Sequence, residues 1–179
     1  MNLEVVNLFE LNILVGSFES IDNKKLIKDI LLSNSKLSDD EYHTNYEDTD
    51  FKYSSELDFL VNQINDAYKN ATNKKLELMG YWAHIHEYNE STNLHCHADA
   101  QDVISGPHVS AVYYLQIPKK SGKLVFDFNI NKYQKKRFFV DPSERSFVLF
   151  PSTLDHFVTK NKSKQKRISI SFNFKSTEL

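Results

Sequence analysis

The chain has 179 residues, a length that fits one domain with a substantial hydrophobic core. Its formal net charge of −2 and its isoelectric point near 6.4 give no global basic field, so neither nucleic acid nor an anionic membrane surface is the expected partner. The single cysteine, Cys96, excludes a disulfide framework and a cysteine-rich zinc site. No apolar run approaches the about 20 residues of a membrane span, and these features together predict a cytoplasmic protein.

Two helices are predicted in the first half of the chain. Residues 20–33 carry apolar side chains at helical spacing after Asp22, a residue type that caps helices well. Residues 54–70 carry a second apolar stripe. The segment between them, residues 34–52, is polar and acidic and is longer than most connections. We expect it to be either a mobile segment or a lid over a site.

From residue 76 onward the apolar residues alternate with polar ones, which is typical of strands. Eight segments have this pattern and are separated by turn residues: 76–88, 93–99, 108–118, 122–128, 136–140, 145–151, 155–160 and 166–174. Eight short strands after two helices predict a mainly β fold, a double-stranded β-helix (jelly roll) with the helices packed on one sheet. We expect a single domain over residues 1–179, with a helical part to about residue 75 and a jelly-roll core from about 76 to 175.

The segment "NLHCHAD", residues 93–99, places three metal-ligand side chains at every second position. On a strand, His95, His97 and Asp99 leave the same face, and alternate residues are about 6.6 Å apart. Ligand bonds to a first-row metal are only about 2 Å long, so two neighbours in this series can share one ion and the outer two cannot. His97 therefore belongs to either pair, with His95 or with Asp99. A third ligand is expected from elsewhere, and His156 follows a proline turn at the start of a strand. His108, in a turn, is interpreted as a surface histidine.

A second polar face follows His156. In "RISISFNF", Arg167 and Ser169 lie on the face opposite the apolar residues. A buried arginine on that face favours an anion, because a guanidinium group pairs with a carboxylate through two hydrogen bonds. Tyr114 lies on the more polar face of its own predicted strand, and its hydroxyl could join Arg167 on the same carboxylate.

Five segments in this order, "HCH", "SAVYYLQIP", "GKLVFDF", "FVLFPSTLDHFV" and "KRISISFNF", resemble the small 2-oxoglutarate/Fe(II)-dependent oxygenases of bacteria and phages, relatives of the prolyl hydroxylases. The resemblance covers most of residues 76–174. It implies Fe(II) as metal, 2-oxoglutarate as co-substrate, and hydroxylation of an unknown substrate with release of succinate and carbon dioxide.

The resemblance also implies roles for particular residues. The iron ligands would be His95, His97 and His156, with Asp99 as a hydrogen-bond acceptor beside them. General iron chemistry offers the alternative set His97, Asp99 and His156. Arg167 would bind the distal carboxylate of 2-oxoglutarate, and two residues would help it, Tyr114 and Ser169. The resemblance implies no acid or base catalyst from the protein.

Two other functions remain open from the sequence. In a cupin-type metal enzyme, which needs no 2-oxoglutarate, Asp102 would follow "HCH" as the acidic ligand. As a non-catalytic jelly-roll module, the domain would bind a ligand or serve as a structural element and would catalyse no reaction. The substrate, a small molecule or a peptide, and the oligomeric state are not specified. His84 and His86 either are partly exposed strand residues or line the same cleft as the metal ligands.

Overall fold

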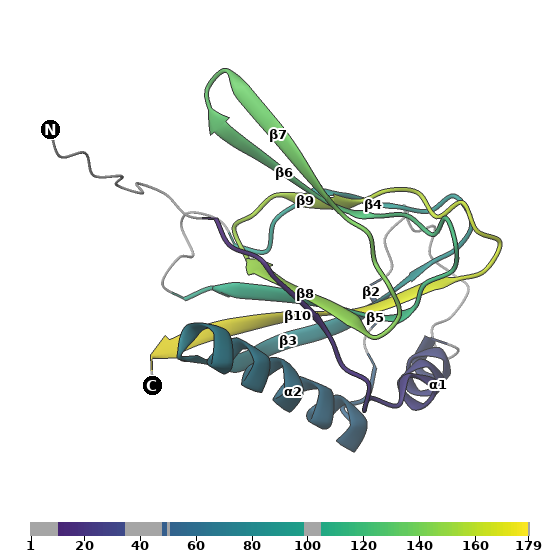
Figure 1. The fold of residues 1–179 in the computed structure, drawn as a ribbon. Helices are drawn as coiled ribbons and strands as arrows, with labels where there is room; N and C mark the ends of the chain where they lie inside the picture. The colour runs from purple at the N-terminus through teal and green to yellow at the C-terminus, as the bar shows by residue number, and fades with distance from the viewer. Residues whose placement is uncertain (1–10, 35–47, 50, 99–104, 179) are drawn as a thin grey trace, which may run out of the picture.

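The computed structural model describes residues 11–34, 48–49, 51–98 and 105–178 of the chain. Figure 1 shows the arrangement of its helices and strands. In chain order they are β1 (Leu14–Ser17), α1 (Asn23–Asn34), β2 (Asp48–Thr49), α2 (Ser55–Thr72), β3 (Lys74–His86), β4 (Thr92–His95), β5 (Val109–Gln116), β6 (Leu124–Asn131), β7 (Gln134–Val140), β8 (Ser146–Pro151), β9 (His156–Val158) and β10 (Arg167–Glu178).

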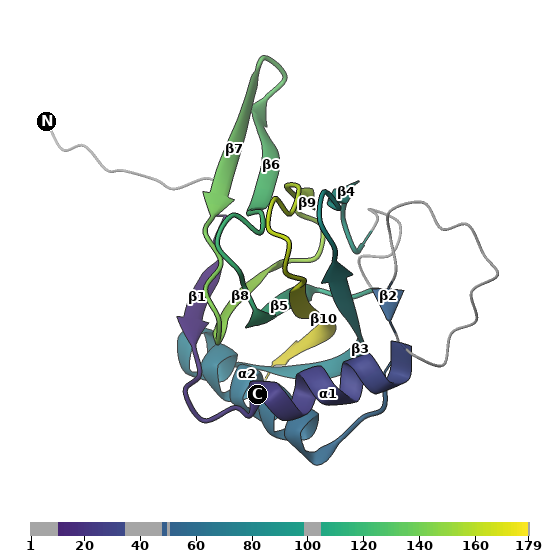
Figure 2. The same ribbon diagram turned by 90° about the vertical axis from the view of Figure 1, so that its right-hand side faces the viewer.

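The strands form two antiparallel sheets. The larger has the order β1-β8-β5-β10-β3-β2 and the smaller the order β4-β9-β6-β7. The two sheets face each other, and both helices lie against the outer face of the larger one (Figures 1 and 2). This is the predicted jelly roll with helices on one sheet. All eight predicted strands form, as β3 to β10, whereas β1 and β2 are additional.

Both predicted helices form, and each begins at a residue that caps its first turn. The Asp22 carboxylate accepts a hydrogen bond from the backbone N–H of Lys25 at 3.1 Å, which confirms Asp22 as the cap of α1. The hydroxyl of Ser54 caps α2 in the same way. Of the acidic segment expected to be mobile or a lid, residues 35–47 and 50 lie outside the described residues. None of the described helices is long and apolar enough to span a membrane.

Strand β10 separates two environments. Its outward side chains belong to the main core, which fills the space between the larger sheet and the helices. Those outward residues are Ile168, Ile170, Phe172 and Phe174, all at most 1% exposed. Its inward side chains, which include Arg167 and Ser169, face the smaller sheet. Because successive side chains of a strand alternate in direction, β10 carries both the core and the polar interior.

Candidate metal centre and anion pocket

Three histidines converge between the two sheets. His95 is the last residue of β4, and its Cα partner across the ladder is His156, the first residue of β9. His97 lies two residues beyond the end of β4. The nitrogen atoms that each side chain can offer to a metal all lie within 4.8 Å of one another. The structure therefore brings together the three histidines that the resemblance implies as ligands.

The strand predicted through residues 93–99 is shorter than expected. It ends at His95, and His97 lies in a bend. The two histidines converge nevertheless, with 3.1 Å between their Nε2 atoms. The prediction that three side chains leave one continuous strand was therefore wrong in its extent. Asp99 lies outside the described residues, and so does Asp102, the acid of the cupin alternative.

Hydrogen bonds fix which nitrogen of each histidine faces the centre. Nδ1 of His95 lies 2.8 Å from the carbonyl oxygen of Asn93, and Nδ1 of His156 lies 2.8 Å from that of Leu154. A carbonyl oxygen only accepts, so both Nδ1 atoms donate and each Nε2 keeps its lone pair. Burial lowers the pKa of His156 to about 3, which keeps the ring in the neutral form that binds metals.

The third ring, His97, is held by side chains from the larger sheet. Its Nδ1 lies 2.7 Å from Oδ1 of Asn173 and 2.8 Å from the hydroxyl of Ser110. Burial lowers the pKa of His97 to about 4. The hydroxyl of Ser152 lies 2.8 Å from that of Ser110, and the carbonyl of Ser152 accepts from the backbone N–H of His97. All three Nδ1 atoms are thus occupied by partners of the kind that orient metal-binding histidines.

Arg167, which is 1% exposed, lies at the centre of a candidate anion site. One terminal nitrogen of its guanidinium donates to the hydroxyl of Ser169 at 3.2 Å, and the group lies 5.3 Å from the centre of the Tyr114 ring. Within the described part of the chain, neither the Nε atom of Arg167 nor the hydroxyl of Tyr114 has a hydrogen-bond partner. Burial raises the pKa of Tyr114 to about 12, so its hydroxyl remains a donor. Buried donors without partners are costly, and a carboxylate would satisfy both.

His86 is buried, at 5% exposure, and contacts Arg167 directly. Its Nδ1 lies 3.3 Å from the same guanidinium nitrogen, and its Nε2 lies 2.8 Å from the hydroxyl of Thr92. Arginine only donates, so Nδ1 accepts and Nε2–H donates to Thr92. His84 is half-buried and accepts a hydrogen bond from Trp82. Both histidines therefore lie inside the barrel, as the second of the two interpretations had it.

His108 lies away from the three converging histidines. It is half-buried, and its Nδ1 contacts the backbone of Ser176 at the end of β10. Sequence reasoning did not assign Asn173 or Ser110 a role. The sequence did indicate that Asn173 shares a strand face with Arg167 and that Ser110 shares one with Tyr114. Only the observed pairing of Asn173 with Ser110 shows that the two side chains lie together beside His97.

The model of a family described as "Putative 2OG-Fe(II) oxygenase" matches residues 80–173, just over half of the chain. No curated protein sequence matches significantly.

Solved structures share the fold at low sequence identity. A prolyl-4-hydroxylase from Pseudomonas putida is 17% identical, with a TM-score of 0.65 over 94% of each chain. A Trichoplax adhaerens prolyl hydroxylase, solved with a peptide of a hypoxia inducible factor, is 15% identical, with a TM-score of 0.66 over 90% of this chain and 82% of that one. The epimerase SnoN, solved with Fe3+, alpha ketoglutarate and nogalamycin RO, is 10% identical, with a TM-score of 0.67 over 94% and 79%.

Proposed function

This chain belongs to the 2OG-Fe(II) oxygenase family, and on that premise we propose that it hydroxylates a C–H bond of its substrate with release of succinate and carbon dioxide. The cofactors of the family are Fe(II) and 2-oxoglutarate. One observation carries the assignment to this site: two buried donors, on Arg167 and Tyr114, have no partner among the described residues and lie in the same barrel as three converging histidines. We further propose that the helical and jelly-roll parts form one oxygenase domain.

His95, His97 and His156 would hold the iron. Hydrogen bonds anchor each ring through Nδ1, so Nε2 is the nitrogen that each ring would offer to the metal. Imidazole nitrogen is a suitable ligand for Fe(II). Bound Fe(II) and 2-oxoglutarate would supply the oxidising chemistry with dioxygen as the oxidant, one oxygen atom ending in succinate and the other in the substrate hydroxyl, with release of carbon dioxide. The protein would position the iron and 2-oxoglutarate and keep water away from the site. The rings of Phe150 and Trp82 lie 4.7 and 5.3 Å from the rings of His156 and His97 and exclude water from them.

Arg167, Tyr114 and Ser169 would hold the distal carboxylate of 2-oxoglutarate. Nε of Arg167 and the Tyr114 hydroxyl would donate to that carboxylate, and Ser169 would keep the guanidinium in place. This pocket supports the oxygenase over the cupin alternative, because a cupin has no need of a buried arginine for a keto acid. One neighbour was solved with a peptide and another with nogalamycin RO, so the substrate class follows from neither.

An anaerobic titration tests the proposal. Fe(II) and 2-oxoglutarate added together should produce a weak visible charge-transfer band, and admission of air should yield succinate. Arg167→Met should abolish the band at 2-oxoglutarate concentrations that saturate the wild type. Absence of both the band and succinate would refute the proposal.

A pair of variants tests the ligand set. We expect His95→Ala to lose Fe(II) binding and Asp99→Ala to retain it, measured by metal content after gel filtration. Loss of iron from the Asp99 variant alone would instead assign Asp99 in place of His95. Retention of iron by both variants would place the metal elsewhere.

A further inference from the structure

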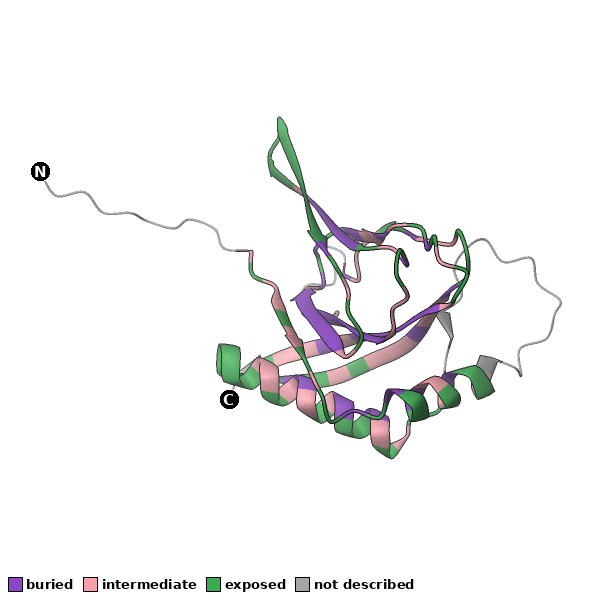
Figure 3. Cartoon of the chain, turned by 45° about the vertical axis from the view of Figure 1, so that its right-hand side comes forward, coloured by how far each residue is buried: buried purple, intermediate pink, exposed green. Residues whose placement is uncertain are grey.

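The β6–β7 hairpin projects beyond the rest of the jelly roll (Figures 1 and 2). Among the described strands, β7 lies at the edge of the smaller sheet and pairs only with β6. Residues 129–139 are exposed without interruption, and Figure 3 shows the outer part of the hairpin as exposed. Three of its aromatic rings are more than half exposed, those of Tyr133, Phe138 and Phe139. An exposed ribbon with large apolar side chains is typical of an interaction surface.

One of the two faces of the hairpin is continuous with the histidine cluster. Phe126 of β6 is opposite both His156 of β9 and Phe138 of β7, so these three side chains share one face. The next pair on that face, toward the tip of the hairpin, is Phe128 with Lys136. This inner face is therefore continuous with the histidine cluster and extends it outward past the end of β9.

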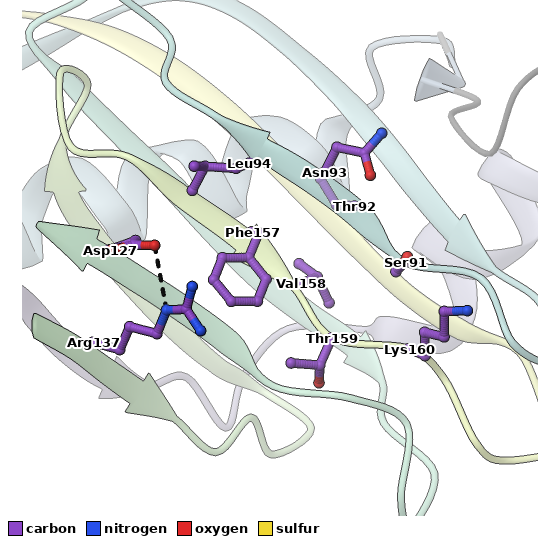
Figure 4. A pocket seen from close by; sticks show the side chains of 10 residues that line it. All are labelled: Ser91, Thr92, Asn93, Leu94, Asp127, Arg137, Phe157, Val158, Thr159 and Lys160. Carbon is purple, nitrogen blue, oxygen red and sulfur yellow. Dashed lines mark hydrogen bonds and ion pairs between the residues drawn. The ribbon is translucent and has the colours of Figure 1, made fainter. Parts of the chain in front are cut away.

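On the outer face of the hairpin, one buried carboxylate pairs with two basic side chains. Asp127, 3% exposed, binds Lys135 at 3.1 Å and Arg137 at 3.3 Å. Asp127, Arg137 and Phe157 line a pocket (Figure 4) whose volume is about 440 Å3. The Arg137 guanidinium lies 5.5 Å from the centre of the Phe157 ring. The two outer cations thus share one buried carboxylate of the protein.

The inner face carries a cation without such a partner. Lys136 forms no ion pair or hydrogen bond with any residue that the structure describes, and residues 128–140 contain four basic side chains and no acidic one. Lys132, at the tip, lies 4.7 Å from the ring of Tyr133. An aromatic wall that ends in an unpaired cation is complementary to a ligand that is apolar near the histidines and negatively charged farther out.

We propose that the inner face of the β6–β7 hairpin docks an extended acidic polypeptide segment, which presents the residue to be oxidised to the histidine cluster and places a carboxylate on Lys136. This inference rests on the proposed function, since it names the substrate class of the same site. A polypeptide suits the surface because an extended chain lying over the inner face can cross β6 and β7 and span the distance from His156 to Lys136. A nucleic acid, the other polyanion that the four basic side chains could attract, is distinguished from a peptide by the oligonucleotide competition described below.

The sheet geometry also sets a spacing. From His156 to Lys136 there are two strand spacings across the sheet and one pleat along it, together about 12 Å. An extended chain advances about 3.3 Å per residue, so the carboxylate should lie about four residues from the oxidised position.

A displayed library of random dodecapeptides provides the probe. It is selected anaerobically on the full chain loaded with Fe(II) and 2-oxoglutarate. The same selection is made on Lys136→Gln, on Lys136→Glu, and on Lys135→Gln as the matched control on the outer face of the same strand. The wild type and Lys135→Gln should enrich Asp and Glu about two- to fivefold over the unselected library, as expected for an exposed ion pair. Lys136→Gln should lose the enrichment, and Lys136→Glu should enrich Lys and Arg instead.

Three results would overturn the inference. They are selection without preference for acidic residues, an equal loss in both glutamine variants, and displacement of the selected peptides by a single-stranded thymidine oligonucleotide at the same concentration. Succinate formed in air without any substrate is measured in parallel on all four proteins. If succinate forms but the acidic preference is absent, only the docking surface is wrong. If the preference is present but no succinate forms, the proposed function is wrong and the surface is a peptide-binding site.

Discussion

At the scale of single residues, the direction of each hydrogen bond determines what the pocket can bind. One terminal nitrogen of Arg167 is held by His86 and Ser169, whereas its Nε–H has no partner among the described residues and could donate to a ligand. His86 can accept from Arg167 only because its proton is on Nε2, where the hydroxyl of Thr92 accepts it. Thr92 therefore influences the anion pocket from a different strand, without touching the anion.

Replacing Thr92 by valine tests this relay. The variant keeps the shape of the side chain and removes the acceptor that fixes the tautomer of His86. We expect the dissociation constant for 2-oxoglutarate, measured anaerobically from the charge-transfer band, to rise about two- to tenfold, the usual worth of one hydrogen bond. The same change at Thr177, an exposed residue of β10, serves as control. Equal constants for the Thr92 variant and the wild type would show that the tautomer is fixed by other means.

Replacing Asn173 tests the support of the metal centre. Asn173→Leu removes the acceptor for Nδ1 of His97, so the ring loses its fixed orientation. Fe(II) affinity should fall about 10- to 100-fold, as is usual for a hydrogen-bond partner of a metal ligand. Asn173→Asp keeps an acceptor and should retain affinity, as measured by competition with a chelator. An unchanged affinity in the leucine variant would contradict this role.

The sequence could predict the three histidines but not their supports. His95, His97 and His156 have side chains typical of metal sites, and their spacing indicated a shared ion. The roles of Asn173 and Ser110 depend on the register between β10 and β5, which sets them opposite each other. No local pattern contains that register.

At the scale of elements, the sheets account for both the correct and the incorrect predictions. Strand β10 was predictable because its apolar and polar residues alternate over its first eight positions. Strand β4 was predicted too long because its sequence also alternates through residue 99. Its neighbour β9 has only three residues, so the ladder ends at the His95–His156 pair. Beyond it, the backbone N–H of His97 donates to the carbonyl of Ser152 instead.

The two faces of β10 predict separate effects on stability and on binding. Phe172 is fully buried among the helices and the larger sheet, so Phe172→Ala should lower the free energy of unfolding by about 3–5 kcal/mol. Phe139→Ala, at a half-exposed ring of β7, should cost much less. Urea denaturation measures both. A cost at Phe172 no larger than at Phe139 would mean that the helix layer is not the main core.

At the scale of the whole molecule, the buried histidine His86 should make stability depend on pH. Burial, and then the charge of Arg167, lower its pKa from 6.5 to about 3. Between these two values the unfolded chain binds a proton that the folded chain does not. The contribution of His86 is therefore complete above about pH 6.5 and is lost as the pH falls toward about 3, by up to about 1.4 kcal/mol per pH unit.

The variant His86→Gln isolates this contribution. Its free energy of unfolding, measured by urea denaturation between pH 4.5 and 6.5, should fall less steeply with decreasing pH than that of the wild type. Only the slopes are compared, so a constant loss of stability in the variant does not affect the result. Parallel curves would show that His86 is not the group responsible.

Because β10 carries chemistry on one side and packing on the other, its length is under a stricter constraint than its composition. Insertion or deletion of one residue between Arg167 and Phe174 would put the two ends of this stretch out of phase, so that either the phenylalanines turn into the barrel or the arginine turns into the helix layer. The hairpin tip near Lys132 is exposed, so a change in its length would not move core residues. During divergence, related chains should therefore vary in length at the tip of the hairpin, where a new substrate can be accommodated, and keep β10 free of gaps.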